Sequence, residues 1–232
     1  MPTANQFEVE VKTLLGGKKA ADDFVAKLKQ ADGALQQTAR SNQLNHYFDS
    51  DGDPDKVAKA VAKFLGEDDL AAFRRIIGQA KSYALRTRDA DGRILLVIKA
   101  AAGGSRDGDD QHALERLEGE YGTTAPDIDT LDEAIRSAGY DFLSKWSRER
   151  IEYAYKDYTV CLDRNAGYGY LAEVEKIVPS SDEAETAREA ILGELASLGF
   201  EELSQERVGR MFEHYNRHWP EYYKTEKTFT IE

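Results

Sequence analysis

The stretch Phe7-Glu8-Val9-Glu10-Val11-Lys12-Thr13-Leu14 shows most clearly how this chain folds. Charged residues at Glu8, Glu10 and Lys12 alternate with two valines. Successive side chains of a β-strand point to opposite faces of the sheet, so a strand here has one charged face and one apolar face. Strict alternation of this kind predicts a half-buried strand over residues 7–14.

The same alternation of charge recurs on four further predicted strands. These are Arg86-x-Arg88, Glu118-x-Glu120, Arg148-x-Arg150 and Glu173-x-Glu175. A sheet with one wet face explains any single strand of this type. Five strands carrying charges in pairs favour a second interpretation, in which the charged faces converge on one ligand. Carboxylates suit divalent cations, and guanidinium or ammonium groups suit phosphate oxygens. Alternation by itself leaves both interpretations open.

The rest of the chain predicts an α+β fold with strands paired mostly by hairpins. Further strands are expected in the second half of 35–49, at 82–89 and 93–101 around the turn Asp91-Gly92, at 112–121, at 142–162 with one bend or break, and at 169–178. Helices are expected at 18–31, 54–65, 68–79, 131–138, 181–198 and 205–217, the last ended by Pro220. A polar loop is expected at 103–110 and an aromatic tail at 222–232.

Composition narrows the classes of function. The 232 residues carry a net charge of −12 and are 41% hydrophobic, which permits a core and argues against general nucleic-acid binding. We expect no signal peptide, and no apolar run approaches the roughly 18 residues of a membrane span. Cys161 is the single cysteine, so we expect a protein of the reducing cytoplasm.

The ordered motifs of this chain resemble those of the CYTH superfamily, the triphosphate tunnel metalloenzymes. That family begins with an ExExK strand, as found at Glu8-x-Glu10-x-Lys12. The remaining elements follow in order as Gln43-x-Asn45-x-Tyr47-Phe48-Asp49, Leu85-Arg86-x-Arg88 with Asp91-Gly92 and Lys99, Arg116-Leu117-Glu118-x-Glu120, Arg148-x-Arg150-x-x-Tyr153, and Asp163 with Glu173-x-Glu175. The resemblance covers about residues 6–178, and the ordered set is far more specific than any one motif.

The resemblance implies an eight-stranded antiparallel β-barrel, the triphosphate tunnel, with helices packed outside. We therefore expect a tunnel domain at 1–180 with a helical insertion at about 50–80. The helices and tail of 181–232 are expected to pack on the same domain.

The resemblance also implies the site residues. The expected metal ligands are Glu8, Glu10, Glu120, Asp163, Glu173 and Glu175. The expected phosphate-binding residues are Lys12, Arg86, Arg88, Lys99, Arg148 and Arg150. Glu10, Lys12 and Arg150 are the expected catalytic residues, with Tyr153 at most an auxiliary hydrogen-bonding residue.

The function implied is hydrolysis of a triphosphate with Mg²⁺ or Mn²⁺, inorganic triphosphate being the first choice of substrate. One alternative is a class IV adenylyl cyclase, which converts ATP to cyclic AMP and pyrophosphate. A second alternative is a non-catalytic module that binds polyphosphate or nucleotide. The expected partner is a small-molecule triphosphate, with neither nucleic acid nor membrane, and the protein is expected to be a monomer or homodimer.

Three other patterns predict structural roles. Residues 49–53 resemble the start of an EF-hand, but Pro54 and Ala60 stand where its glycine and glutamate belong, which favours a helix-entry turn. His214 and His218 are spaced for one helix face but have no third ligand in sequence. Cys161 lies in an apolar strand, so a core thiol is favoured over a nucleophile.

Overall fold

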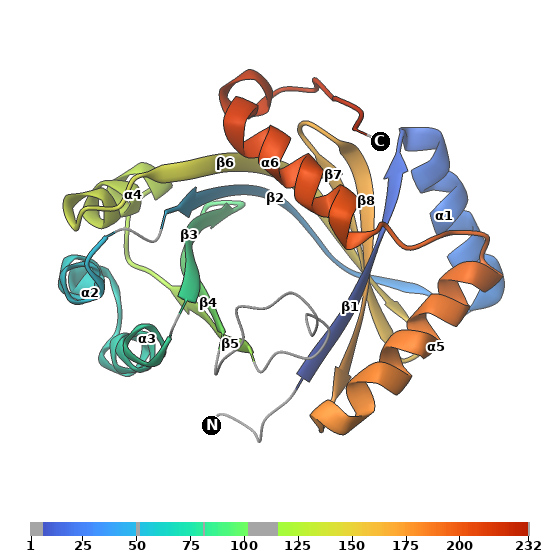
Figure 1. Ribbon diagram of the computed structural model, residues 1–232, viewed down its shortest axis with the longest axis horizontal. Helices are drawn as coiled ribbons and strands as arrows, with labels where there is room; N and C mark the ends of the chain where they lie inside the picture. The colour runs from blue at the N-terminus through green and yellow to red at the C-terminus, as the bar shows by residue number, and fades with distance from the viewer. Residues whose placement is uncertain (1–6, 50–51, 81, 102–115, 232) are drawn as a thin grey trace. The chain divides into compact units, whose positions relative to one another are not determined.

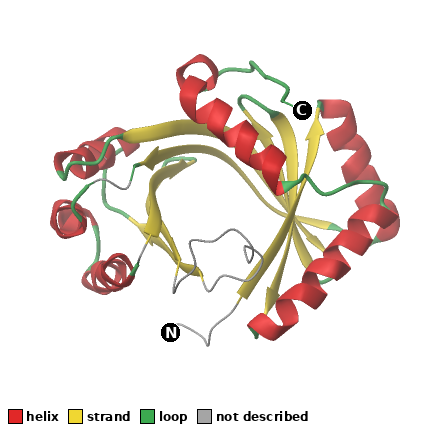
Figure 2. Cartoon of the chain, in the orientation of Figure 1, coloured by secondary structure: helices red, strands yellow, loops and turns green. Residues whose placement is uncertain are grey.

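The computed structural model describes residues 7–49, 52–80, 82–101 and 116–231 (Figure 1). The loop expected at 103–110 lies outside the described residues. The strands are β1 (Phe7–Gly16), β2 (Gln36–Phe48), β3 (Ser82–Ala90), β4 (Arg93–Ala101), β5 (Arg116–Gly122), β6 (Phe142–Tyr155), β7 (Tyr158–Asn165) and β8 (Gly169–Val178). The helices are α1 (Lys18–Ala31), α2 (Pro54–Val61), η1 (Ala62–Phe64), α3 (Glu67–Gln79), α4 (Ile128–Ser137), η2 (Ser181–Glu183), α5 (Ala184–Ser197) and α6 (Gln205–Tyr222). Figure 2 separates the two kinds of element by colour.

The eight strands belong to one sheet of order β1-β8-β7-β6-β2-β3-β4-β5. Every strand pair with a recorded register is antiparallel. The eight-stranded antiparallel fold is therefore confirmed. Barrel closure is not, because within the described residues the order begins at β1 and ends at β5 without a pairing between those two strands. Alternation within a strand is local, whereas closure depends on tilt and stagger accumulated over all strands.

The chain divides into two compact units. Among the described residues, unit 1 comprises 7–41 and 148–231, and unit 2 comprises 42–101 and 116–147, apart from the undescribed positions between them. Strands β2 and β6 each contribute residues to both units.

The core of unit 1 covers the apolar face of β1, β7 and β8. Val9 and Val11 of β1 and Val174 of β8 pack there against Phe24 of α1 and Ile191 of α5. All five side chains are at most 3% exposed. Helices α1 and α5 therefore cover the apolar face of these strands (Figure 1). Because side chains alternate along a strand, the charged residues of the same strands point the other way.

The core of unit 2 also consists of helices packed on the apolar face of strands, but the helices are different ones. Leu96 and Ile98 of β4 pack with Val57 of α2, Phe73 of α3 and Leu131 of α4, all fully buried. The expected helices at 54–65 and 68–79 are present as α2 with η1 and as α3. These helices cover the apolar face of β3 and β4.

Local sequence signals explain several turns. The β3–β4 hairpin turns at Asp91 and Gly92, whose φ angles of 52° and 86° match the turn that twists with its strands. The expected strand at 142–162 is broken once, into β6 and β7, at a turn where Lys156 has a φ of 53°. Gly169 opens β8 with a φ of 76°, and a side chain there would lie 2.2 Å from the Gly16 carbonyl oxygen of β1.

The boundaries of helices α4 and α6 differ from the prediction. Helix α6 continues through Pro220 to Tyr222. Proline removes one backbone donor, and this close to a helix end the loss is tolerated, since the Tyr223 amide still donates to the Trp219 carbonyl at 2.8 Å. Helix α4 begins at Ile128 rather than 131, because the Asp127 side chain accepts from the Thr130 amide at 2.7 Å and caps the helix.

Candidate active site

The charged face of unit 1 is assembled by strand register. Glu10 of β1 lies directly opposite Glu175 of β8, and Lys12 lies opposite Glu173. Residues directly opposite each other in antiparallel strands point to the same face. The alternation within the two strands therefore places the glutamates of β1, the glutamates of β8 and Lys12 together, on the face away from α1 and α5.

Three of these carboxylates form a group that could hold a metal ion. Oxygen atoms of Glu8, Glu10 and Glu175 lie within 4.8 Å of one another. Burial, together with the charges of Glu173 and Glu8, raises the pKa of Glu175 to about 7. A raised pKa is the expected result when like charges share a site without a cation. The all-oxygen donor set is the kind that Mg²⁺ and Mn²⁺ prefer, so these residues fit the expected metal.

Glu173 is in a different electrostatic position from Glu175, although only two residues separate them. Burial by itself would raise the pKa of Glu173, but Arg150, Lys12 and Arg148 lower it to about 2. Its side chain forms ion pairs with Lys12 at 3.5 Å and with Arg150. Lys12 also donates to Glu10 at 2.7 Å, so this lysine links a glutamate of β1 to a glutamate of β8.

Asp163 of β7 holds the two arginines of β6. Its carboxylate is 1% exposed and accepts from Arg148 Nη1 at 2.7 Å and from Arg150 Nε and Nη2 at 2.7 and 2.6 Å. Bidentate pairing fixes the plane of the Arg150 guanidinium. The expected metal-binding role of Asp163 stays a prediction; in this structure its oxygens bind arginines.

Cys161 occupies the charged face, which the sequence interpretation missed. It lies opposite Glu173 on β8 and Glu152 on β6, and its sulfur is close to carboxylate oxygens of Glu173 and Glu175. Burial raises the pKa of the thiol, which therefore stays protonated at neutral pH. The residue is buried, as a core thiol would be, but its neighbours on this face are acids.

Unit 2 contains basic residues that are hydrogen-bonded to neighbouring side chains on β2. Arg86 donates to the Tyr47 hydroxyl at 2.6 Å, and Arg88 donates to the Asn45 side-chain oxygen at 2.8 Å. Arg88 also pairs with Glu120 at 2.8 Å, and this glutamate is 43% exposed. The metal-binding role expected for Glu120 stays a prediction.

Register places the unit 2 residues on one face. Asn45 lies opposite Arg88 and Tyr47 opposite Arg86, while Lys99 of β4 lies opposite Ala84 of β3. Lys99 is thus two positions along the same face from Arg86. The side chain of Glu118, from the same motif as Glu120, lies outside the described residues.

Sequence reasoning missed the supporting contacts of Asn45 and Tyr47, although it quoted both residues. The available signal was the spacing: Asn45 and Tyr47 are two residues apart, as Arg86 and Arg88 are, so each pair lies on one face of its strand. Tyr153 lies one position out of phase with Arg148 and Arg150, and it packs against the apolar core of unit 1. The auxiliary hydrogen-bonding role considered for Tyr153 stays a prediction.

The competing motifs have structural roles. Asp53 Oδ1 accepts from the Asp55 and Lys56 amides at 2.9 and 3.1 Å, so it caps α2, which confirms the helix-entry turn. His214 and His218 stack with ring centroids 4.4 Å apart, and the Nδ1 of His218 lies 2.8 Å from the His214 carbonyl oxygen.

The chain belongs to the CYTH family, because the model of the CYTH domain matches residues 6–209. The match includes the charged strands of both units.

Solved structures show the same fold at low sequence identity. The PH1012 protein of Pyrococcus horikoshii is 17% identical, with 86% of this chain and 93% of that chain covered and a TM-score of 0.56. The PH1819 protein of the same organism is 22% identical, with 85% and 93% covered and a TM-score of 0.55. A structure described as a candidate adenylate cyclase of Vibrio parahaemolyticus is 16% identical, with 87% and 95% covered and a TM-score of 0.54. No curated protein sequence matches the chain.

Among the described residues, none of the helices combines the length and apolar character needed to cross a membrane.

Proposed function

We propose that this protein hydrolyses a triphosphate in a reaction that depends on Mg²⁺ or Mn²⁺, with inorganic triphosphate as the first substrate to test. One observation carries the proposal: three carboxylates within 4.8 Å of one another share a strand face with Lys12, Arg148 and Arg150. An anion binder has little use for grouped acids, whereas a metal-complexed polyphosphate needs both charges. Membership of the CYTH family supports the same proposal.

In the proposed reaction, water attacks the terminal phosphorus and the bond to the bridging oxygen breaks. Orthophosphate and pyrophosphate are released from inorganic triphosphate. A bound divalent metal supplies positive charge and lowers the pKa of a coordinated water. Glu8, Glu10 and Glu175 would hold that ion, with Glu173, Glu120 and Asp163 as the further candidates.

The basic residues would neutralise and orient the phosphates. Lys12 is held between Glu10 and Glu173, and these acids keep its pKa raised against the effect of burial, so it stays charged. Arg148 and Arg150 are oriented by Asp163 and present planar donors to phosphate oxygens. Arg86, Arg88 and Lys99 of unit 2 would also bind phosphate oxygens. Charge that develops in the transition state is stabilised best by groups already in place.

Product analysis tests the proposal. Purified protein is incubated with inorganic triphosphate, ATP or thiamine triphosphate in Mg²⁺, Mn²⁺ or EDTA, and orthophosphate, pyrophosphate and cyclic AMP are measured. We expect orthophosphate release that disappears in EDTA. Cyclic AMP and pyrophosphate from ATP would instead support the adenylyl cyclase alternative, which is the activity in the description of the Vibrio structure. Binding without turnover in every metal would support the non-catalytic alternative.

A further inference from the structure

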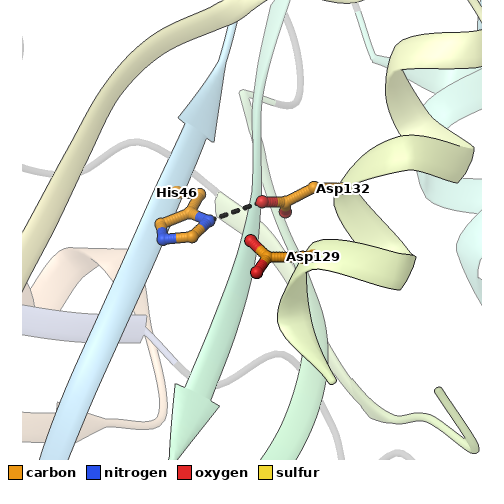
Figure 3. Close-up of side chains that lie close together, drawn as sticks. All are labelled: His46, Asp129 and Asp132. Atoms are coloured by element: carbon orange, nitrogen blue, oxygen red, sulfur yellow. Dashed lines mark hydrogen bonds and ion pairs between the residues drawn. The ribbon is translucent and has the colours of Figure 1, made fainter. Parts of the chain in front are cut away.

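A buried polar network lies behind the arginine-bearing strands of unit 2. Asp132 of α4 is 2% exposed, and its Oδ2 lies 2.6 Å from His46 Nδ1 on β2. The Thr87 hydroxyl of β3 donates to the other oxygen, Oδ1, also at 2.6 Å. Figure 3 shows the Asp132 carboxylate pointing from the helix toward the histidine ring. One helical side chain therefore binds two adjacent strands.

The surroundings of this network make it unusual. His46 and Thr87 are 1% and 0% exposed, and the helix face around Asp132 packs in the apolar core through Leu131 and Ile135. Acids are almost never fully buried unless they are paired, and a buried polar group that loses its partner is costly. A leucine at this position would pack without needing a hydrogen-bond partner, so we infer that the carboxylate has a specific structural role.

The register of β2 and β3 indicates that role. His46 lies directly opposite Thr87, and the neighbouring opposite pairs are Asn45 with Arg88 and Tyr47 with Arg86. A slip of one residue would send every side chain of a strand to the other face. By binding His46 and Thr87 together, Asp132 holds the register in which both arginines meet their supports.

The same network has a composition that could suggest a metal site, because His46, Asp129 and Asp132 offer ligand atoms within 4.8 Å of one another. Two observations argue against that interpretation. Both oxygens of Asp132 already make short hydrogen bonds, and Lys145 Nζ lies 3.8 Å from Oδ2, where it supplies positive charge. A bound cation would meet that ammonium group at close range.

We propose that Asp132 is a positioning residue: it clamps β2 to β3 through His46 and Thr87 and so sets Arg86 and Arg88 for phosphate binding. The inference rests on the proposed function for its consequence in catalysis. Its structural content, a clamp on the register of two strands, is independent of that function.

The experiment compares Asp132→Ala with Leu131→Ala. Both residues lie on α4 and are buried, and truncation of either one loosens the packing of that helix. Of these two residues, only Asp132 has side-chain hydrogen bonds to His46 of β2 and Thr87 of β3. We expect the KM for inorganic triphosphate to rise about tenfold in Asp132→Ala and to stay within about twofold in Leu131→Ala, with kcat changing less than KM in both. Asp132→Asn keeps an acceptor for Thr87 and a partner for His46, so it should restore KM to within about threefold of the parent.

Hydrogen exchange separates the clamp from the proposed function. Amides of residues 43–48 and 85–90 should exchange faster in Asp132→Ala than in Leu131→Ala, under conditions that equalise the global stability of the two variants. If the parent protein does not turn over triphosphate, the proposed function fails and the exchange comparison still decides on the clamp. Equal exchange in the two variants, or an equal rise in KM, overturns the inference. A stoichiometric Zn²⁺ or Mn²⁺ ion that is bound by the parent and lost in Asp132→Asn would also overturn it, in favour of a metal site.

Discussion

Units 1 and 2 each have a polar face and an apolar face, but they use the two faces differently. The polar face of unit 1 interleaves acids with bases: Lys12 contacts two glutamates, and Arg150 contacts Asp163 and Glu173. In unit 2 Arg86 donates to the Tyr47 hydroxyl, and Arg88 donates to the Asn45 side-chain oxygen and pairs with Glu120. Grouped acids suit a divalent cation, while the guanidinium groups of Arg86 and Arg88 suit phosphate oxygens.

The opposite faces of these strands, which pack against the helices, also differ between the two units. The face of β1 and β8 that packs on α1 and α5 is formed by apolar side chains such as Val9, Val11 and Val174. The corresponding face of β2 and β3 contains the Asp132 network within its apolar layer. In unit 1 the salt bridges that orient the functional groups thus lie on the charged face of the strands. In unit 2 some of the polar contacts, those of Asp132, lie on the face that packs against the helices.

The largest effect is expected from removing a carboxylate of unit 1. Glu10→Gln should lower metal-dependent turnover about 10³-fold while the fold is retained, because the metal group loses one charged ligand and Lys12 loses its closest partner. Steady-state phosphate release in Mg²⁺ and Mn²⁺ measures this. Glu149→Gln is the matched control, since Glu149 is one residue out of phase with Arg148 and Arg150 on β6 and pairs with the exposed Arg40. Parental turnover in Glu10→Gln would remove Glu10 from the site.

The next effect tests the geometry of the unit 1 arginines. Arg150→Lys keeps the charge but loses the bidentate contact with Asp163, so we expect kcat/KM to fall about 10²-fold. Arg164→Lys serves as the control, because Arg164 lies on β7 one position out of phase with Asp163 and pairs with the exposed Glu226. Equal losses in the two variants would show that the guanidinium plane at residue 150 is not used.

A smaller effect concerns the stability of the metal-free protein. The folded-state pKa of Glu175 is raised from 4.5 to about 7, so its contribution to stability is fully present below pH 4.5 and is lost as the pH rises through 7. Glu175→Gln removes this loss and should increase the free energy of unfolding at pH 8 in EDTA by about 2 kcal/mol relative to the parent, and by much less at pH 4.5. Urea denaturation at both pH values measures the difference. A variant less stable than the parent at pH 8 would contradict the account in which burial and neighbouring like charges raise the pKa of Glu175.

The smallest effect is expected in unit 2. Arg86→Ala should raise the KM for inorganic triphosphate about tenfold, equivalent to about 1.4 kcal/mol, with little change in unfolding. Tyr47→Phe removes only the hydroxyl that supports Arg86, so its KM should rise less. Saturation kinetics on both variants measure this order. Unchanged kinetics in Arg86→Ala would exclude the residue from phosphate binding.

Much of the fold was predictable because its signals are local. Period-two alternation placed β1, β3, β4 and β8, and the Asp91-Gly92 turn placed the hairpin. Asp53-Pro54 placed the start of α2. The division of residues between the charged and apolar faces followed from the same alternation. Barrel closure is not confirmed among the described residues, and the prediction that Pro220 ends the last helix was wrong, because each depends on context beyond the neighbouring residues.

The sequence by itself therefore determined which side chains share a strand face and which chemical class they belong to. Only the tertiary structure decided which residues are paired across strands: Glu10 with Glu175, Lys12 with Glu173, and Asp163 with both β6 arginines. These pairings join residues up to 165 positions apart, and they also give Glu173 and Glu175 opposite pKa shifts although both belong to one motif. The physical reason is that alternation is a property of one strand, whereas register, burial and local charge are properties of several strands packed together.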